Sequence, residues 1–350
     1  MTEKSYGGNN GVREHLGKAS KLKDSPKHVK INKTKTLTTS TSKSDDINNK
    51  VSNNSKLNEL DSYKKAGEIA KKIIIFAKNL IKPDMLLLEI AQKIESEIIK
   101  EGAQVAFPVN LSIDDIAAHY HPTLDDKTKA TGLLKVDIGI HVNGFIADTA
   151  FSLDLTPDKK HKELIKASED ALEAALSTLN QHPSLNEIGK AIQQEIEKKG
   201  FSPIINLCGH GLDQYNIHSG ITIPNYANNN TNIIEPGAYA IEPFATTGEG
   251  KIYEGAGSNI YKIENLRNPR GPTARKILEY IWGKNQTLPF SLRELQEKFG
   301  PMTKLAMKEL EQLGIVHHYP QLIEVSHKPV SQAEHTFIKT KEGKIIITTR

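Results

Sequence analysis

The chain has 350 residues, of which 37% are hydrophobic and 25% are charged, an ordinary composition for one large globular domain or two smaller ones. It has no run of about 18 or more apolar residues, which excludes a helix that spans a membrane. Its single cysteine, Cys208, cannot form an internal disulfide, and the polar residues 1–10 lack the apolar run of a secretory signal. We therefore expect a cytoplasmic protein.

The positive charge of the chain lies in its first segment. Residues 1–56 contain 12 Lys and Arg against 5 Asp and Glu, whereas the remainder sums to −3 within a total of +4. Residues 1–57 bury too little apolar surface to offset the entropy of ordering, so we interpret them as a disordered tail. Such a tail either contacts a polyanion, such as ribosomal RNA, or only keeps the protein soluble.

Periodic patterns of apolar residues begin after this tail. Apolar residues recur at helical spacing before Pro83, which ends the first helix. In chain order, the patterns predict further helices over residues 85–101, 159–181 and 184–199, and strand-like segments over residues 133–155, 239–245 and 334–349.

An internal repeat links two of these helices. Residues 87–102 are identical to residues 185–200 at eight of 16 positions, at an offset of 98. This offset is too long for a solenoid unit, and chance similarity between two amphipathic helices is the alternative explanation. The repeat favours a pseudo-two-fold α+β domain in which each half has helices followed by strands. We expect the active site at the junction of the halves.

The segment 134–149 carries the first candidate site. Asn143-Gly144 predicts a type I′ hairpin turn, which makes Asp137 and Asp148 diagonal neighbours with Cβ atoms roughly 7 Å apart. Two carboxylates on an apolar hairpin repel each other, and a divalent cation is the simplest remedy. The alternative is two solvent-facing aspartates on an edge hairpin.

The second half supplies matching acidic residues. Glu242 follows Gly237 as Asp137 follows Gly132, at an offset of 105, so each half contributes a carboxylate five residues after a glycine. Glu334 adds a further carboxylate at the start of the last predicted strand.

Three histidines accompany these carboxylates. His119 and His218 are 99 residues apart, close to the repeat offset, and His210 lies eight residues before His218. A single histidine in such a position is more often structural. Near convergent carboxylates, the three together indicate a shared cleft.

Carboxylates with one imidazole suit Mn, Fe, Co or Zn. Two such ions, bridged by carboxylates, would acidify a shared water and stabilise an oxyanion, which is the chemistry of a hydrolase. We see no activated serine and no phosphate-binding P-loop. Cys208 follows apolar residues, so we expect it to pack rather than to act as a nucleophile.

Five motifs in order resemble the type 2 methionine aminopeptidases, most closely the archaeal members, over about residues 58–350. The motifs lie within residues 106–122, 137–149, 209–225, 240–245 and 333–336. The resemblance implies the pita-bread (creatinase/aminopeptidase) fold. It also implies removal of the initiator methionine from nascent proteins whose second residue is small and uncharged, by attack of a hydroxide bound to two divalent ions (Co, Mn, Fe or Zn).

The resemblance also assigns roles to individual residues. It implies a set of metal ligands, two histidines that act on the scissile bond, a carboxylate that moves the proton of the attacking water, and an apolar pocket for methionine. These are, in that order, Asp137, Asp148, His210, Glu242 and Glu334; His119 and His218; Glu242; and Phe107, Ile217 and Tyr319.

Residues 269–318 match the helical insertion of the type 2 enzymes. Three helices are predicted there, over residues 273–282, 291–299 and 303–313, in an arrangement that resembles a winged helix. Its mixed charges show no basic recognition face, so we expect no DNA binding.

The insertion would divide the catalytic domain into residues 58–268 and 319–350. We expect a monomer that acts on the N-termini of nascent polypeptides, without a membrane contact, and that reaches the ribosome, if at all, through its basic tail.

Two other functions compete with this interpretation. An X-Pro aminopeptidase or prolidase would share the five ligands, but such enzymes usually carry a separate N-terminal domain, for which the tail is too polar. A non-enzymatic, RNA-associated protein of the same fold would have lost metal ligands, whereas all five are present.

Overall fold

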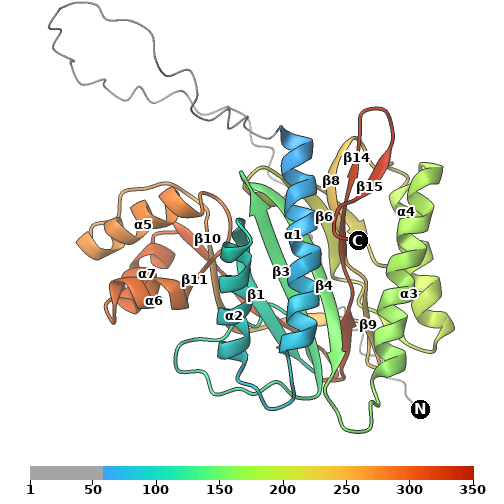
Figure 1. Cartoon of the computed structure of the whole chain (residues 1–350), viewed down its shortest axis with the longest axis horizontal. Helices are drawn as coiled ribbons and strands as arrows, with labels where there is room; N and C mark the ends of the chain where they lie inside the picture. Colours follow the sequence, from blue (N-terminus) through green and yellow to red (C-terminus); the bar gives the residue numbers. More distant parts are fainter. Residues whose placement is uncertain (1–57) are drawn as a thin grey trace, which may run out of the picture. The chain divides into compact units, whose positions relative to one another are not determined.

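The computed structural model describes residues 58–350, which form one compact unit, and the predicted tail lies outside the described residues. In the first half, two helices precede a group of antiparallel strands (Figure 1). These elements are α1 (Glu59–Leu80), α2 (Leu87–Lys100), β1 (Gln104–Ile113), β2 (Ile116–Ala118), β3 (Leu133–Val142) and β4 (Phe145–Asp154).

The second half repeats this order and then adds further strands around a helical segment. Its first elements are α3 (Lys162–Thr178), a 3₁₀ turn (Leu179–Gln181), α4 (Leu185–Lys198), β5 (Ser202–Pro203), β6 (Cys208–Asp213), β7 (Asn216–Pro224), β8 (Gly237–Ile241) and β9 (Phe244–Thr246). The remaining elements are β10 (Ile252–Ile263), α5 (Pro272–Lys284), β11 (Phe290–Ser291), α6 (Leu292–Phe299), α7 (Thr303–Gln312), β12 (Val316–Glu324), β13 (Val330–Gln332), β14 (His335–Lys339) and β15 (Ile345–Ile347).

The four helices of the two halves confirm the sequence prediction, with local signals at their ends. α1 stops before Pro83, and α4 begins with a capping box between Ser184 and Glu187. Gly102 and Gly200, the repeated glycines, adopt φ angles of +83° and +79°, which L side chains rarely take, and each lies just after a helix end. Among the described residues, no helix is both long enough and apolar enough to cross a membrane.

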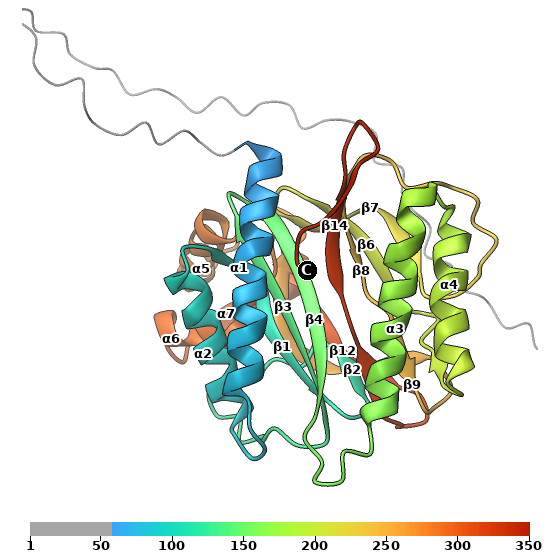
Figure 2. The ribbon, with the colours of Figure 1, turned by 45° about the vertical axis from the view of Figure 1, so that its right-hand side comes forward.

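The strands form two principal sheets, one from each half. The first has the order β1-β3-β4 and the second the order β15-β14-β8-β6-β7. α1 and α2 cover the first sheet, while α3 and α4 cover the second half (Figure 2). Two further sheets, β11-β10-β12-β2 and β13-β9-β5, complete the body. The repeat seen in the sequence therefore corresponds to two similar helix-and-sheet halves.

The predicted hairpin is present in the predicted register. Val142 pairs with Phe145, and Gly139 pairs with Asp148. Both turn residues have positive φ, 55° at Asn143 and 86° at Gly144, as a type I′ turn requires.

Two predicted strands are each divided in the structure. The predicted strand 239–245 is interrupted at Glu242-Pro243, and its parts, β8 and β9, belong to different sheets. Proline has no N–H to donate to a ladder, which accounts for the break. The predicted strand 334–349 is a hairpin of β14 and β15, which turns near Gly343, where φ is +82°.

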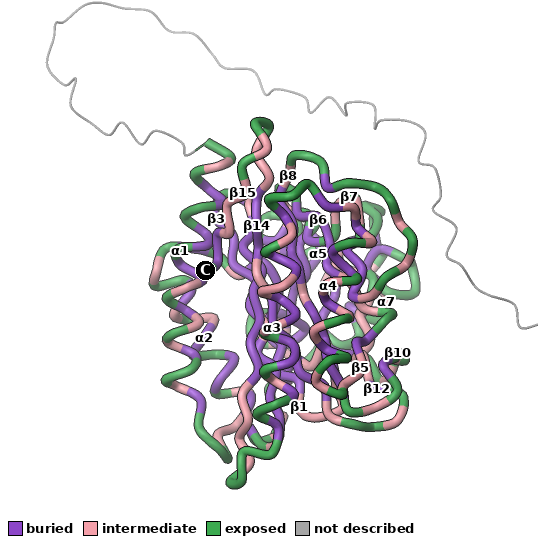
Figure 3. Tube along the Cα trace, turned by 90° about the vertical axis from the view of Figure 1, so that its right-hand side faces the viewer, coloured by how far each residue is buried: buried purple, intermediate pink, exposed green. Residues whose placement is uncertain are grey.

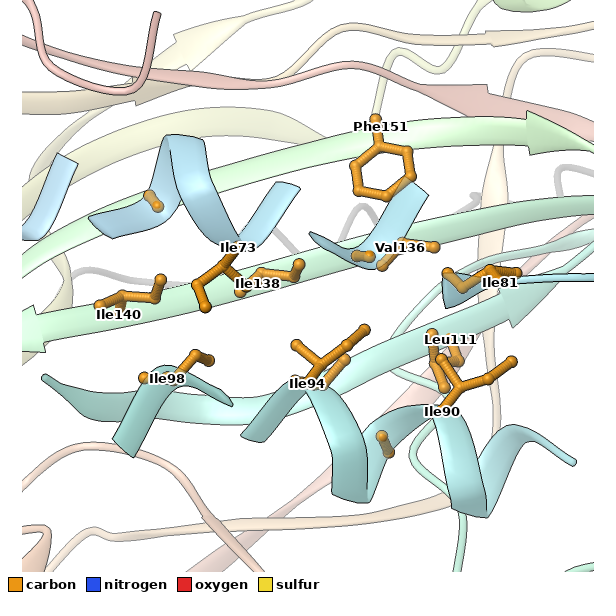
Figure 4. Close-up of a cluster of buried hydrophobic side chains, with 14 of the residues drawn as sticks. Ile73, Ile81, Ile90, Ile94, Ile98, Leu111, Val136, Ile138, Ile140 and Phe151 are labelled. Carbon is orange, nitrogen blue, oxygen red and sulfur yellow. The ribbon is translucent and has the colours of Figure 1, made fainter. Parts of the chain in front are cut away.

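The core between the first sheet and its helices is built from aliphatic side chains. Ile73 of α1, Ile94 of α2 and Ile138 of β3 are fully buried in it. Figure 4 shows labelled side chains from both helices and from β1, β3 and β4 meeting in this layer. Buried segments follow the strands, and exposed segments follow the outer faces of the helices (Figure 3). The carboxylates carried by the same strands thus lie in a rigid, apolar frame.

The helical segment leaves the body between two paired strands. β10 and β12 pair up to Ile263 and Val316, and the intervening chain contains α5, α6 and α7, close to the predicted helices. These helices have an apolar core of their own, which includes Ile277 and Leu310.

Buried polar contacts attach this segment to the first half. His121 is 2% exposed, and its ring bonds the carbonyl of Val109 (2.9 Å) and the hydroxyl of Ser291 (2.8 Å). Arg293, also buried, pairs with Glu95 of α2.

The buried His121 predicts a pH dependence of stability. Burial lowers its pKa from 6.5 to about 3, so the unfolded chain binds this proton first and stability is lost as the pH falls below about 6.5. Between about pH 6.5 and pH 5 the loss is roughly 1.5 kcal/mol, measured by urea unfolding in the presence of a chelator. His121→Asn should remove this contribution, and His182→Asn, at an exposed histidine, should retain it. Equal pH dependence in both variants would contradict the assignment.

Candidate active site

The five predicted metal ligands come from separate elements and meet in one cavity. Asp137 lies on β3, Asp148 on β4 and His210 on β6, while Glu242 directly follows β8 and Glu334 directly precedes β14. All five line a cavity of about 340 Å³. The first sheet supplies two of these side chains and the second half supplies three, so the cavity lies at the junction of the halves.

The ligand atoms are close enough to share a cation. One ligand atom each from Asp148, His210 and Glu334 lie within 4.8 Å of one another. The Nε2 atom of His210 is 3.7 Å from a carboxylate oxygen of Asp148 and 3.6 Å from one of Glu242. Asp137 is the diagonal neighbour of Asp148 in the hairpin.

His210 is in the form that a metal ligand needs. Burial lowers its pKa to about 4, so the imidazole is neutral at pH 7. Its Nδ1 atom lies 3.4 Å from the carbonyl of Gly211, to which it can only donate. The lone pair is then on Nε2, the atom that faces Asp148 and Glu242.

The carboxyl groups of the cavity are harder to ionise than ordinary carboxyl groups, because their pKa values are raised. Burial raises the pKa of Asp137 to about 7. Burial, together with the charges of the neighbouring carboxylates, raises the pKa of Asp148, Glu242 and Glu334 well above their ordinary values. Four acidic groups in one buried cavity need a positive partner in order to ionise together.

Unpaired oxygen atoms show that the residues fit metal ions. Asp137 Oδ1, Asp148 Oδ1 and Glu334 Oε2 are buried and have no hydrogen-bond partner among the described residues. Buried polar atoms are normally paired, so three orphaned carboxylate oxygens around one cavity indicate ligands for cations. Oxygen atoms with one imidazole nitrogen are a donor set for borderline and hard divalent ions.

The two other predicted histidines also line this cavity. The ring of His218 lies edge-on to that of His210, with centroids 4.5 Å apart. His119 contacts the ring of Tyr319 in the same manner at 5.5 Å, and its Nδ1 bonds the carbonyl of Pro320 at 3.1 Å. Desolvation lowers the pKa of the half-buried His119, so its ring is neutral at pH 7, whereas His218 is a solvent-exposed residue that lines the cavity.

The predicted pocket residues Phe107, Ile217 and Tyr319 line the cavity as well. The sequence analysis did not identify several other apolar residues that line the same cavity. They are Ala118, Leu207, Phe244, Ile260, Pro289 and Leu322. Ala118 and Phe244 lie within the motifs that contain His119 and Glu242, and Leu207 is three residues before His210, so these three had a usable signal. Ile260, Pro289 and Leu322 come from other strands or from the helical segment and carry no such signal.

Gln332 is a second residue that the sequence did not single out. It is 1% exposed, and its Nε2 donates to Asp137 Oδ2 at 3.4 Å. Its position two residues before Glu334 was the available signal. Asn110, also missed, lies opposite Asp137 in the β1–β3 pair and lines the cavity.

Cys208 lines the cavity but is not suited to attack a substrate. Burial raises the pKa of its thiol to about 11, which keeps it protonated at neutral pH. This agrees with the expectation that it has no nucleophilic role.

The fold and the site define a metal-dependent hydrolase, and comparison with known proteins identifies its family. The model of metallopeptidase family M24 matches residues 61–267. A methionine aminopeptidase of Pyrococcus abyssi is 42% identical over 295 residues, covering 83% of this chain and 99% of the relative. A methionine aminopeptidase of Methanocaldococcus jannaschii is 42% identical over 298 residues, with 83% and 100% covered.

Solved structures agree in fold. A thermophilic Arx1 superposes with a TM-score of 0.70 at 18% identity, over 82% of this chain and 89% of that one. A methionine aminopeptidase of Rickettsia prowazekii superposes with a TM-score of 0.58 at 19% identity, over 82% and 95%. The pseudo-two-fold architecture is thus the predicted pita-bread fold.

The chain belongs to the methionine aminopeptidases of metallopeptidase family M24. It is a metal-dependent peptidase that removes the N-terminal methionine from proteins, and divalent metal ions are its cofactor.

The buried carboxyls predict how metal and pH act together. Folding raises the pKa of Asp137 from 3.8 to about 7, so the metal-free chain loses stability as the pH rises through this range. Metal binding needs the ionised carboxylates, so the increase in Tm on addition of Mn²⁺ should be larger at about pH 7.5 than at about pH 5.5.

Differential scanning calorimetry of chelator-treated protein measures this difference. Asp137→Asn should diminish the Mn²⁺-dependent increase, while Glu342→Gln, which changes an exposed carboxylate, should leave it intact. An equal increase at both pH values would contradict the site.

Proposed function

We propose that this chain holds two divalent ions, drawn from Co, Mn, Fe or Zn, through Asp137, Asp148, His210, Glu242 and Glu334. Asp137, Asp148, Glu242 and Glu334 would supply the carboxylate ligands in this proposal, and His210 would supply the imidazole ligand. The observation that carries it is the set of buried, unpaired carboxylate oxygens around one neutral imidazole.

The chemistry of the site divides between the ions and the protein. Bound ions lower the pKa of water and stabilise negative charge on a carbonyl oxygen. Glu242, beside His210, accepts the proton that the attacking water loses. His218 donates a hydrogen bond to the oxygen of the scissile carbonyl, where negative charge develops during the attack.

His119 orients the scissile bond in this mechanism. Its Nδ1 donates to the carbonyl of Pro320, so in the neutral ring Nε2 carries the lone pair. Nε2 can therefore accept a hydrogen bond from the scissile N–H, which fixes the peptide for attack.

The cavity explains why methionine is selected. Phe107, Ile217 and Tyr319 provide apolar and aromatic surface in the cavity that also holds the acidic residues, and such a surface suits one unbranched thioether side chain. We further propose that the second residue of the substrate must be small and uncharged.

We also propose roles for segments of the chain outside the cavity. The helical segment, residues 269–318, forms an insertion between residues 58–268 and 319–350 of the catalytic domain. The enzyme acts as a cytoplasmic monomer on nascent chains, and any contact that it makes with the ribosome runs through its basic tail, residues 1–57. The charge of +7 in residues 1–56 supports the last statement.

Hydrolysis of a Met-Ala-Ser peptide tests the proposed function. The chain should cleave it in the presence of Mn²⁺ or Co²⁺, and Asp137→Asn and Glu334→Gln should each reduce kcat/KM by roughly a thousandfold or more, because each removes a negative ligand. Circular dichroism of each variant should match that of the unchanged protein. Unchanged turnover in either variant would refute the metal-ligand assignments.

The same assay separates the rival substrate class. The proposed specificity predicts cleavage of Met-Ala-Ser and no cleavage of Ala-Pro peptides. Preferential cleavage after a residue that precedes proline would instead indicate an X-Pro aminopeptidase.

A further inference from the structure

Two segments from opposite halves run side by side next to the five proposed metal ligands, which we call the metal cluster. They are β4 of the first sheet and the chain from Gln332 to Thr336, which leads from β13 into β14. Their residues face each other in antiparallel order, and a direct backbone bond joins Glu334 N to Ala150 O at 3.0 Å. The two segments nevertheless belong to different sheets.

On both sides of this backbone bond, a side-chain hydroxyl replaces the direct backbone hydrogen bonds that a β-ladder would form. The hydroxyl of Thr336 accepts a bond from Asp148 N at 2.8 Å and donates to Asp148 O at 2.8 Å. Ser152 does the same for Gln332, accepting from its N–H at 2.9 Å and donating to its carbonyl at 2.8 Å.

A third hydroxyl completes the set. Thr149 donates to the carbonyl of Glu334 at 3.0 Å. We call Thr149, Ser152 and Thr336 together the hydroxyl seam. All three side chains are buried, and the two threonines are fully so.

The hydroxyl seam has a geometric consequence for the two backbones. At Asp148 and at Gln332, the connection between the two backbones runs through a side-chain hydroxyl and not through a direct ladder bond. The hydroxyl satisfies both the N–H and the carbonyl of each of these residues, so the missing ladder bonds leave neither group unpaired.

The residues held in this way are those of the metal cluster. Thr336 fixes the backbone of Asp148, and Thr149 fixes that of Glu334, each from the opposite half. Asp148 and Glu334 are also the residues whose carboxylates carry orphaned oxygens beside His210. Ser152 fixes Gln332, which in turn contacts Asp137.

We propose that the hydroxyl seam is a positioning device that sets the separation of Asp148 and Glu334 at the value that divalent ions require. Repulsion between the two carboxylates pushes the halves apart, and a shortened seam would bring them too close. The seam resists both displacements because its hydroxyls are bonded across the junction. Thr149 and Thr336 are thus positioning residues that act through Asp148 and Glu334, and the inference rests on the metal-holding role proposed for these two.

Removal of single hydroxyl groups tests the proposal. Thr149→Val and Thr336→Val keep the shape of the side chain but leave a buried carbonyl or N–H unpaired. We expect each to weaken the binding of Mn²⁺, measured by isothermal titration calorimetry on the full chain, by roughly tenfold or more. Thr149→Ser and Thr336→Ser retain the hydroxyl and should restore most of the affinity.

A matched threonine controls for loss of stability. Thr303, at the start of α7, is fully buried and bonds the carbonyl of Gly300, far from the metal cluster in the chain. Thr303→Val should lower the Tm of the metal-free chain without changing its affinity for Mn²⁺. Thr149→Val removes only one hydrogen bond, so it remains a test even where Thr336→Val does not fold.

The outcomes distinguish a failure of the positioning role of the hydroxyl seam from a failure of the proposed metal site. Glu334→Gln should abolish tight Mn²⁺ binding; if it does not, the proposed function fails. If Glu334→Gln loses the metal while Thr149→Val and Thr336→Val bind Mn²⁺ as tightly as the unchanged chain, only the positioning role is overturned.

Discussion

Repulsion among four buried carboxylates is the constraint on which the rest of the structure depends. The two halves of the chain bring Asp137, Asp148, Glu242 and Glu334 into one cavity, where burial raises the pKa of all four and the neighbouring charges raise those of Asp148, Glu242 and Glu334 further. Such a cluster is stable in its ionised form only around cations. The fold must therefore hold these like charges together rigidly enough that they do not move apart.

The duplicated architecture explains how this is achieved. Each half is a sheet backed by two helices, and the aliphatic core beneath β3 and β4 fixes the aspartates of the hairpin. The second sheet presents His210 and the two glutamates from the other side. Because the halves meet edge to edge without a continuous ladder, side-chain hydroxyls join them at the site. The two halves of the chain are thus joined at the residues that form the site.

Substrate selection uses a different part of the same junction. Apolar residues from both halves, together with Pro289 of the helical segment, line the part of the cavity that we propose receives the methionine side chain. His119 and His218 line the same cavity as the acidic cluster and the apolar residues. An aminopeptidase needs such an adjacency, since the first side chain must be recognised beside the bond that is cut.

The sequence by itself determined the parts of this protein that are local. Asn143-Gly144 specified the hairpin turn and hence the pairing that places Asp137 beside Asp148, and the repeat indicated two similar halves. It did not reveal Gln332 or the hydroxyl seam, and it joined β8 to β9 across Pro243. Gln332 and the hydroxyl seam depend on contacts between segments about 180 residues apart, such as Ser152 with Gln332. The sequence of a strand does not indicate the hydrogen-bond partner of a serine or threonine hydroxyl. Only the tertiary structure decides which backbone group that hydroxyl bonds.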